Sequence, residues 1–464
     1  MSKRVLTLVA LTILMAATVR AGGLMTNTNY HIAFDRMMAR GATFDIDAAY
    51  SNPAGLAWGK DGFQLSLNFQ KPWQNRDIKL DDTKYEGVAS APIVPALFAA
   101  YKKDKWAISS MIGIVGSGGF VKYDNGVPEF NMLLGTLITQ MTQGLSVATN
   151  GFAPVVKPDQ FDSEMKGKQY IYGGQINFTY KLLDCISAAA GIRVNYYDGY
   201  YRGHVKANHS TMGNLASLSL DVDQKGWGFT PMVSFNYHQG PLTLTARYEF
   251  RTKIETKNET NSLETSLNSE QLIEAPLVKL VAAGAMTAET AAEGAAIIKG
   301  KVNDLLAPYI APYQDGVRTR YDMPALLSVA AGYEFTPKLR ATLEYHFFDD
   351  KNAKMANDRQ DELTHGTHEI LAGVEYDIND KFTVSCGGQR TDYGLSDGYQ
   401  RNTSFACDSY SIGLGGAWNI SEKIRLNAGY FISIYSDYEK QTSYGLETYS
   451  RTNNVIGVGI DYRF

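Results

Sequence analysis

The chain has 464 residues and a net charge of −4 at neutral pH, and its lysines and arginines form no basic block. This balance gives nucleic-acid binding no electrostatic support. Mean hydropathy is −0.22, and no apolar stretch approaches the length of a transmembrane helix, which excludes a helical inner-membrane protein. The 29 Tyr, 20 Phe, 5 Trp and 43 Gly suit the aromatic girdles and curved strands of a membrane β-barrel.

Residues 1–21 have the three parts of a secretory signal peptide. Lys3 and Arg4 precede an apolar run over 5–17, and Val19 and Ala21 stand where a signal peptidase requires small residues. We expect cleavage after Ala21. No Cys follows the site, which argues against a lipoprotein.

From residue 63 to the end, short segments alternate apolar and polar residues with a period of two. This pattern places the two sets on opposite faces of a β-strand. About fourteen strands are predicted, an even number as in bacterial outer-membrane barrels. They lie near 63–69, 94–102, 106–114, 170–180, 186–196, 227–237, 242–250, 325–335, 339–347, 365–378, 382–391, 406–420, 424–438 and 451–464.

The connections between these strands alternate in length. Short turns on one side and long loops on the other are typical of a membrane barrel and not of a soluble sandwich. The sequence therefore predicts an all-β fold, a 14-stranded antiparallel transmembrane β-barrel over 63–464, in the outer membrane of a Gram-negative bacterium. The long links are expected near 119–167, 203–223, 256–316, 349–364, 391–405 and 439–450.

Two of the long loops contain helical patterns, over about 126–150 and 270–312. Each has an apolar stripe at the i, i+3, i+4 spacing of an amphipathic helix, and Thr290 and Glu293 form a capping-box pattern. The stripes either pack on each other and on the barrel rim or leave an apolar groove at the cell surface. The candidate groove residues are Leu134, Ile138, Val302 and Leu306.

The last strand places Ile456, Val458 and Ile460 on one face and ends on Phe464. We expect it to close the barrel against the strand that begins at Phe63. Its terminal aromatic residue is expected to be recognised by the barrel-assembly machinery.

Residues 22–62 lie outside the strand series and cannot be a transmembrane element. They contain Ala39-Arg40-Gly41-Ala42, an Asp45 to Ala49 stretch and then Asn52-Pro53-Ala54. Here the chain resembles the FadL family of outer-membrane channels for hydrophobic compounds, whose members include fatty acid and aromatic-hydrocarbon transporters. Asn52, Pro53 and Ala54 match the NPA motif of that family.

The resemblance implies that residues 22–62 form a plug, or hatch, inside a fourteen-stranded barrel. Ligand would enter through a surface groove, occupy a lumen pocket and leave sideways where the third strand is kinked. Gly113, Gly116 and Gly118 in that strand would permit the kink, although glycines also serve plain curvature.

Candidate ligand contacts come from the hatch and from the inward face of the strands. Arg193 and Arg247 could grip a carboxylate, but lumen arginines more often pair with lumen glutamates. Phe34, Met37 and Met38 could contact an acyl chain or could pack the hatch.

The predicted function is passive uptake of hydrophobic compounds, most simply long-chain fatty acids. An aromatic-hydrocarbon channel of the same type, a surface adhesion or structural barrel, and a general diffusion porin are the alternatives. No catalytic constellation, metal site or cofactor is expected, and so the chain is not expected to be an enzyme. The expected partners are hydrophobic small molecules and outer-membrane lipid, and the expected state is a monomer.

Overall fold

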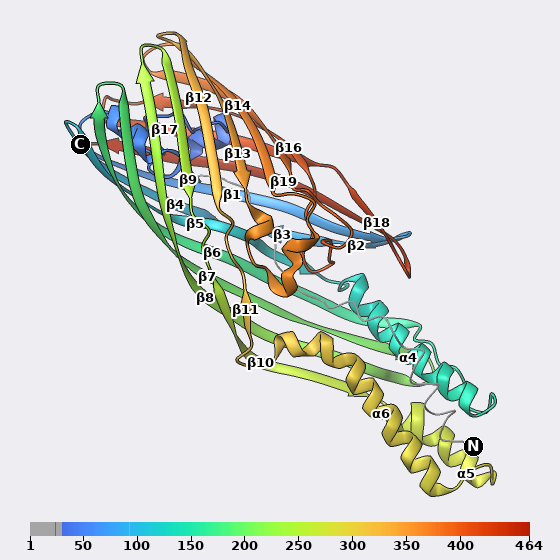
Figure 1. The fold of residues 1–464 in the computed structure, drawn as a ribbon. Coiled ribbons are helices and arrows are strands. Elements are labelled where there is room, and N and C mark those ends of the chain that lie inside the picture. Colours follow the sequence, from blue (N-terminus) through green and yellow to red (C-terminus); the bar gives the residue numbers. More distant parts are fainter. Residues whose placement is uncertain (1–23, 25–29, 92) are drawn as a thin grey trace.

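The computed structural model describes Leu24, residues 30–91 and residues 93–464. The predicted signal peptide lies outside these residues. Strands dominate the described chain and close into one antiparallel barrel (Figure 1). No helix among the described residues is long and apolar enough to cross a bilayer.

Nineteen hydrogen-bonded segments make fourteen barrel strands, because several strands are interrupted. β2, β3 and β4 follow one another along β1, β10 continues β9 beside β8, β11 leads into β12, and β18 follows β17 beside β19. The ladder between β1 and β19 closes the barrel, as predicted. The bounds are β1 Gly62–Leu80, β2 Thr83–Tyr85, β3 Gly87–Ser90, β4 Val94–Lys103, β5 Trp106–Tyr123, β6 Gln160–Leu183, β7 Ile186–His209, β8 Gly213–Gln239, β9 Leu242–Glu249, β10 Glu255–Leu267, β11 Arg318–Arg320, β12 Leu326–Thr336, β13 Leu339–Phe348, β14 Thr367–Asp377, β15 Phe382–Asp392, β16 Ser409–Asn419, β17 Ile424–Tyr435, β18 Tyr438–Thr442 and β19 Gly445–Arg463.

The short turns gather at one end of the barrel, near the C-terminus, and the long helices lie at the other end (Figure 1). Outer-membrane barrels keep short turns on the periplasmic side, so the helical end faces outward from the cell. The outward face of the strands is apolar: Ile176, Phe178, Trp227 and Phe229 are each more than half exposed. A continuous apolar band around a closed barrel needs lipid to cover it. The predicted fold class is confirmed.

The strands are longer than the alternation predicted. β6 and β7 have 24 residues each and β8 has 27, more than the roughly 9–11 with which a tilted strand crosses a bilayer. Only residues 210–212 connect β7 to β8. The predicted long loop over 203–223 is therefore wrong, and parts of the links at 119–167, 256–316 and 439–450 are strand as well.

The outer parts of these strands were missed because the inward face of a strand changes from polar to apolar side chains along its length. On β8, Thr230 and Ser234 face inward at membrane depth, while Leu218, Leu220 and Val222 face inward farther out. Lipid selects apolar outward residues, but above the lipid the outward residues meet water and become polar. Apolar residues then line the inside, which interrupts the pattern that identified the strands.

Those inward apolar residues pack against helices of the outer end. α4 (Pro128–Ala148), η2 (Glu270–Glu274), α5 (Ala275–Ala282) and α6 (Ala288–Ile310) form one buried apolar cluster with them. The Thr290 capping box was wrong: Thr287 caps α6, because its side chain accepts a hydrogen bond from the Thr290 N–H at 3.2 Å.

Candidate functional site

Residues 30–59 lie inside the barrel lumen and are called the hatch below; of the predicted hatch over 22–62, residues 22, 23 and 25–29 lie outside the described residues. The elements are α2 (Ile32–Met37), α3 (Ala48–Ser51) and the 3₁₀ helix η1 (Pro53–Trp58), and nearly all of their residues are buried. A buried ion pair joins Arg36 to Glu375 on β14, and Glu344 on β13 accepts from the Gly41 N–H at 2.7 Å. The hatch is thus fastened to the wall by charge-assisted hydrogen bonds.

Glycines in the wall make the seat for α2. An ideal Cβ on Gly429 would lie 2.8 Å from the Asp35 Cβ and 3.1 Å from the Arg36 backbone nitrogen. Side chains at these positions would occupy the space of the helix. The wall glycines therefore make room for α2, in addition to any role in strand curvature. The seat comprises Gly373, Gly387, Gly413, Gly415, Gly429, Gly457 and Gly459.

The Asn52-Pro53-Ala54 motif is bonded to three neighbouring strands. The Asn52 side-chain amide donates to the Asn236 side chain at 3.0 Å, and the Ala54 N–H donates to the Ser234 hydroxyl at 3.0 Å. The Pro53 carbonyl accepts from Thr179 on β6 at 2.8 Å. The Ala54 carbonyl accepts from the Ser187 hydroxyl on β7 at 2.7 Å. The motif therefore satisfies buried polar groups on β6, β7 and β8.

We expect Asn52→Ala to lower the free energy of unfolding by about 1 kcal/mol, the usual net contribution of one buried hydrogen bond. Urea unfolding of the barrel in lipid, with Asn236→Ala and the double variant, measures the coupling. Additive losses in the double variant would show that the two amides do not interact.

The two predicted headgroup arginines lie against the hatch. Arg193 forms an ion pair with Glu249 at 2.5 Å, and Arg247 lies 3.1 Å from the same carboxylate. Both guanidinium groups also face the Tyr50 ring, at 5.7 and 5.4 Å from its centroid. This geometry favours the structural alternative, in which lumen arginines and a glutamate satisfy one another.

The wall is broken beside the third strand, β5. Among the described residues, its ladder with β4 ends at Ile112 and its ladder with β3 resumes only at Lys122. On the other side, pairing with β6 shifts register between Ile114 and Gly116 and again between Ser117 and Gly119. Gly119 has a φ of +74°, a backbone conformation that favours glycine. Of the predicted kink residues, Gly116 lies in this stretch and Gly113 at its edge.

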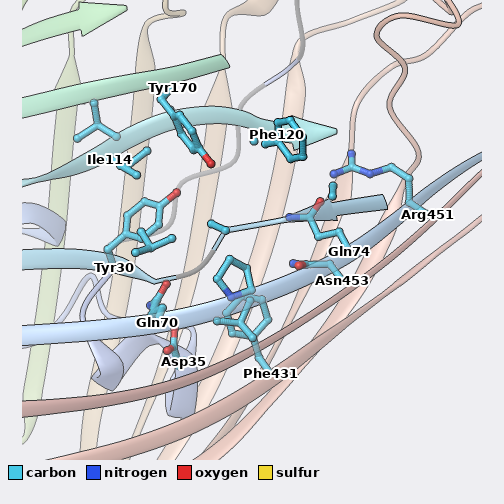
Figure 2. A pocket seen from close by; sticks show the side chains of 18 of the residues that line it. Tyr30, Asp35, Gln70, Gln74, Ile114, Phe120, Tyr170, Phe431, Arg451 and Asn453 are labelled. Atoms are coloured by element: carbon cyan, nitrogen blue, oxygen red, sulfur yellow. Dashed lines mark hydrogen bonds between the residues drawn. The ribbon is translucent and has the colours of Figure 1, made fainter. Parts of the chain in front are cut away.

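A lumen cavity opens beside the break, with about 1120 Å³ of empty space that includes its solvent-open part. Figure 2 shows Ile114, Phe120 and Tyr170 on one side of it and Phe431 on the other. Tyr170 has the parity of the exposed Tyr172 and Ile176 on β6, so the cavity reaches a residue of the outward face. Sequence reasoning missed the β1, β17 and β19 lining residues because they are distant in the chain.

The three predicted hatch contacts, Phe34, Met37 and Met38, are not among the residues that line this cavity. Phe34 packs edge-on against Phe431 with ring centroids 6.3 Å apart, and Met38 belongs to the same buried cluster. Met37 lies against Gly373 and Gly387.

The four predicted groove residues are brought together, but in closed packing. Leu134 and Ile138 of α4 and Val302 and Leu306 of α6 are all buried in one apolar cluster. A groove between them requires the two helices to separate.

A lid of two loops borders the outer side of the cavity. The first is the loop between β13 and β14, which contains η4 (Asp350–Asn352) and η5 (Ala356–Glu362). The second is the loop between β15 and β16, in which the Tyr399 carbonyl accepts a hydrogen bond from Arg359 at 2.6 Å. Tyr393 belongs to the buried cluster of the lid and also lines the cavity. Lid and cavity therefore share a wall.

The lid should loosen as pH rises. Burial raises the pKa of the Asp350 carboxyl to about 7, against a hydrogen bond from the Thr367 N–H at 2.8 Å. The folded lid thus binds a proton more tightly than the unfolded loop, and this stability is lost between about pH 4 and pH 7. Hydrogen exchange of residues 349–366 should accelerate over that range, beyond its intrinsic pH dependence, in the wild type and not in Asp350→Asn.

The fold is similar to that of known outer-membrane barrels. A family profile described as an outer membrane protein beta-barrel domain matches residues 277–464. A crystal structure of a Pseudomonas aeruginosa FadL homologue superposes with a TM-score of 0.63 at 14% identity, covering 96% of this chain and 100% of that one. The fold is that of a FadL-like outer-membrane barrel.

Two toluene transporters of known structure have a similar fold. The Pseudomonas putida toluene transporter TodX gives a TM-score of 0.57 at 13% identity, covering 96% of this chain and 100% of that one. The Ralstonia pickettii toluene transporter TbuX gives 0.52 at 13% identity, covering 90% and 94%. No curated protein sequence matches the chain significantly. At these identities the likeness concerns the fold alone.

Proposed function

We propose that this FadL-like barrel is a channel for passive uptake of hydrophobic compounds, with long-chain fatty acids as the first candidate substrates. The observation that carries the proposal is the lumen cavity beside the broken wall, whose lining includes Ile114, Phe120 and Phe431. Tyr170 of the outward face lines it, and Ala91, Val94 and Ile114 form a small apolar cluster at the break. A hydrophobic ligand bound there would be close to the lipid that surrounds the barrel.

The hatch explains why the exit should be lateral. It lies in the lumen between the cavity and the periplasmic turns, and its polar contacts with the wall are buried. Escape into water would expose the ligand at about 0.8 kcal/mol for each methylene, whereas escape through the wall into lipid avoids that cost.

Access from outside is proposed to run between α4 and α6. Leu134, Ile138, Val302 and Leu306 would line the route once the helices separate, because they already form the apolar contact between that end and the barrel. Serine at Ile138 and Val302 together should then slow uptake while leaving the cavity unchanged.

Uptake by whole cells tests the proposal. Cells that lack their own fatty acid channel should take up radiolabelled oleate faster when they express this chain than with an empty vector. Toluene uptake in parallel distinguishes a hydrocarbon channel, which the aromatic lining by Phe120, Phe431 and Tyr393 would also accommodate. No uptake of either compound by correctly assembled protein would leave adhesion as the function, and a large steady conductance would indicate a porin.

A further inference from the structure

A row of polar side chains crosses the inner wall of the barrel beside the hatch. His346 on β13 pairs in the ladders with Ser328 on β12 and with Glu369 on β14. Arg247 on β9 pairs with Ser328 from the other side. These four residues are at most 2% exposed. Because water does not reach them, each charge in the row has to be balanced by neighbouring protein groups.

The imidazole of His346 lies between two carboxylates. Its Nε2 is 2.7 Å from Glu344 Oε1, and its Nδ1 is 2.9 Å from Glu369 Oε2. The other oxygen of Glu369 accepts from the Gln389 amide at 2.7 Å and from the Thr391 hydroxyl at 3.2 Å. An ionised carboxylate only accepts hydrogen bonds, whereas a neutral imidazole has one donor nitrogen. Both imidazole contacts are hydrogen bonds to ionised carboxylates only when the ring has two protons and a positive charge.

The charges around His346 balance when its imidazole is protonated. Tyr50 of the hatch and Asp350 of the lid approach Glu369, and both are uncharged while they keep their protons. The other charged neighbours in the described part of the lumen are three carboxylates and two guanidinium groups, namely Glu249, Glu344, Glu369, Arg193 and Arg247. Three negative and two positive charges leave one negative charge, which the imidazolium cancels.

Glu344 connects this cluster to the hatch. Its Oε2 accepts from the Gly41 N–H at 2.7 Å, and its Oε1 accepts from the Ser328 hydroxyl at 3.1 Å as well as from His346. A Cβ on Gly41 would lie 2.7 Å from Glu344 Oε1 and 2.7 Å from the Ala330 Cβ. The hatch backbone therefore lies directly on the carboxylate that His346 positions.

We propose that the charged imidazole of His346 is a latch that holds Glu344 against the hatch, and that loss of its proton releases the hatch from this part of the wall. Without the proton, one ring nitrogen would present a lone pair to a carboxylate, and the buried cluster would have an unbalanced negative charge. Water entering at Gly41 would relieve that charge. Because the latched state binds the proton, raising the pH favours the unlatched state. The latch acts on the hatch whichever compound the channel transports.

Conductance across planar bilayers tests the latch. Wild-type channels should conduct little at neutral pH and open reversibly at alkaline pH. His346→Gln should conduct at least about tenfold more than the wild type at neutral pH and lose the response to pH, because removing one partner of a buried ion pair shifts an equilibrium by at least that factor. Adding Glu369→Gln to His346→Gln should restore low conductance, since two carboxylates then face two arginines. A purely structural role for His346 would make the double variant more open than the single one.

His238→Gln is the matched control. The His238 ring also lies against the hatch, 4.9 Å from the Phe44 ring and 5.2 Å from the Trp58 ring, but it forms no ion pair with a carboxylate of the described chain. Its conductance should stay within about twofold of the wild type.

Nitrogen-15 NMR of labelled histidine reports the proton directly, and the signal absent from His346→Gln identifies the ring. Heat-modifiability on gels reports assembly of every variant. A neutral His346 imidazole at neutral pH, wild-type conductance in His346→Gln, or no rescue by Glu369→Gln would each overturn the latch. If His346→Gln does not assemble, the wild type decides: a conductance that does not rise at alkaline pH overturns the proposal.

Discussion

Replacing Gly429 with valine is expected to dislodge the hatch and open a plugged barrel. The new Cβ would lie 2.8 Å from the Asp35 Cβ, 3.1 Å from the Arg36 nitrogen and 3.2 Å from the Ile32 carbonyl oxygen. Most of these atoms are backbone, so no side-chain rotation relieves the clash. Overpacking of this kind costs about 1–3 kcal/mol, while valine itself suits a strand. The barrel should therefore form and the helix should leave its seat.

Conductance across planar bilayers measures this result. We expect wild-type channels to conduct little and Gly429→Val channels to show a large steady conductance, with Gly429→Ala between them. Gly174→Val is the control, because a Cβ on Gly174 would meet nothing within 4 Å. A Gly429→Val barrel with wild-type conductance and thermal stability would show that the seat is not close-packed.

The second large effect concerns the break in the wall. Valine at Gly116 and Gly118 together should favour regular pairing of β5 and so close the gap between Ile112 and Lys122. Ligand would then have to leave through water. Exposing only two methylenes would add about 1.6 kcal/mol to the barrier, and about 1.4 kcal/mol is tenfold in rate. Oleate uptake should fall at least about tenfold.

Measuring the oleate affinity of the double variant distinguishes a defect in ligand exit from a defect in ligand binding. The double variant should bind oleate nearly as well as the wild type, because Gly116 is one of many lining residues and the others are unchanged. Gly174→Val on the neighbouring strand β6 again serves as the control and should transport normally. Uptake at the wild-type rate by an assembled double variant would exclude the break as the exit.

Much of the barrel could be predicted from the sequence. Each of the fourteen predicted strands corresponds to one barrel strand, because lipid demands apolar residues at every second position. The outer extensions of β6, β7 and β8 were missed for the same reason. Above the bilayer the selection that creates the pattern ends, and inward residues such as Leu220 become the apolar set.

The candidate site was less accessible to sequence reasoning. Arg193 and Arg247 satisfied every sequence criterion for a headgroup partner, but Glu249 lies between them. No pattern within one strand reports the partner of an arginine, since the partner comes from another strand.

The wall glycines were visible in the sequence, but what they accommodate was not. Gly413 and Gly415 could be explained by strand curvature alone. In the structure Gly413 faces the Asp35 carbonyl and Gly415 faces the Arg36 Cβ, more than 370 residues away in the chain. The signal that could have found them is a set of inward glycines on neighbouring strands.

The sequence by itself determined which segments cross the bilayer and which side chains of each strand face lipid, because these depend on local alternation against a uniform solvent. It also placed the hatch outside the strand series and Asn52, Pro53 and Ala54 within it. The tertiary structure alone decided where β5 separates from its neighbour, which glycines seat α2, and that Arg193 and Arg247 share one glutamate. Each of these depends on pairing between residues far apart in the chain, and that pairing leaves no local periodicity to read.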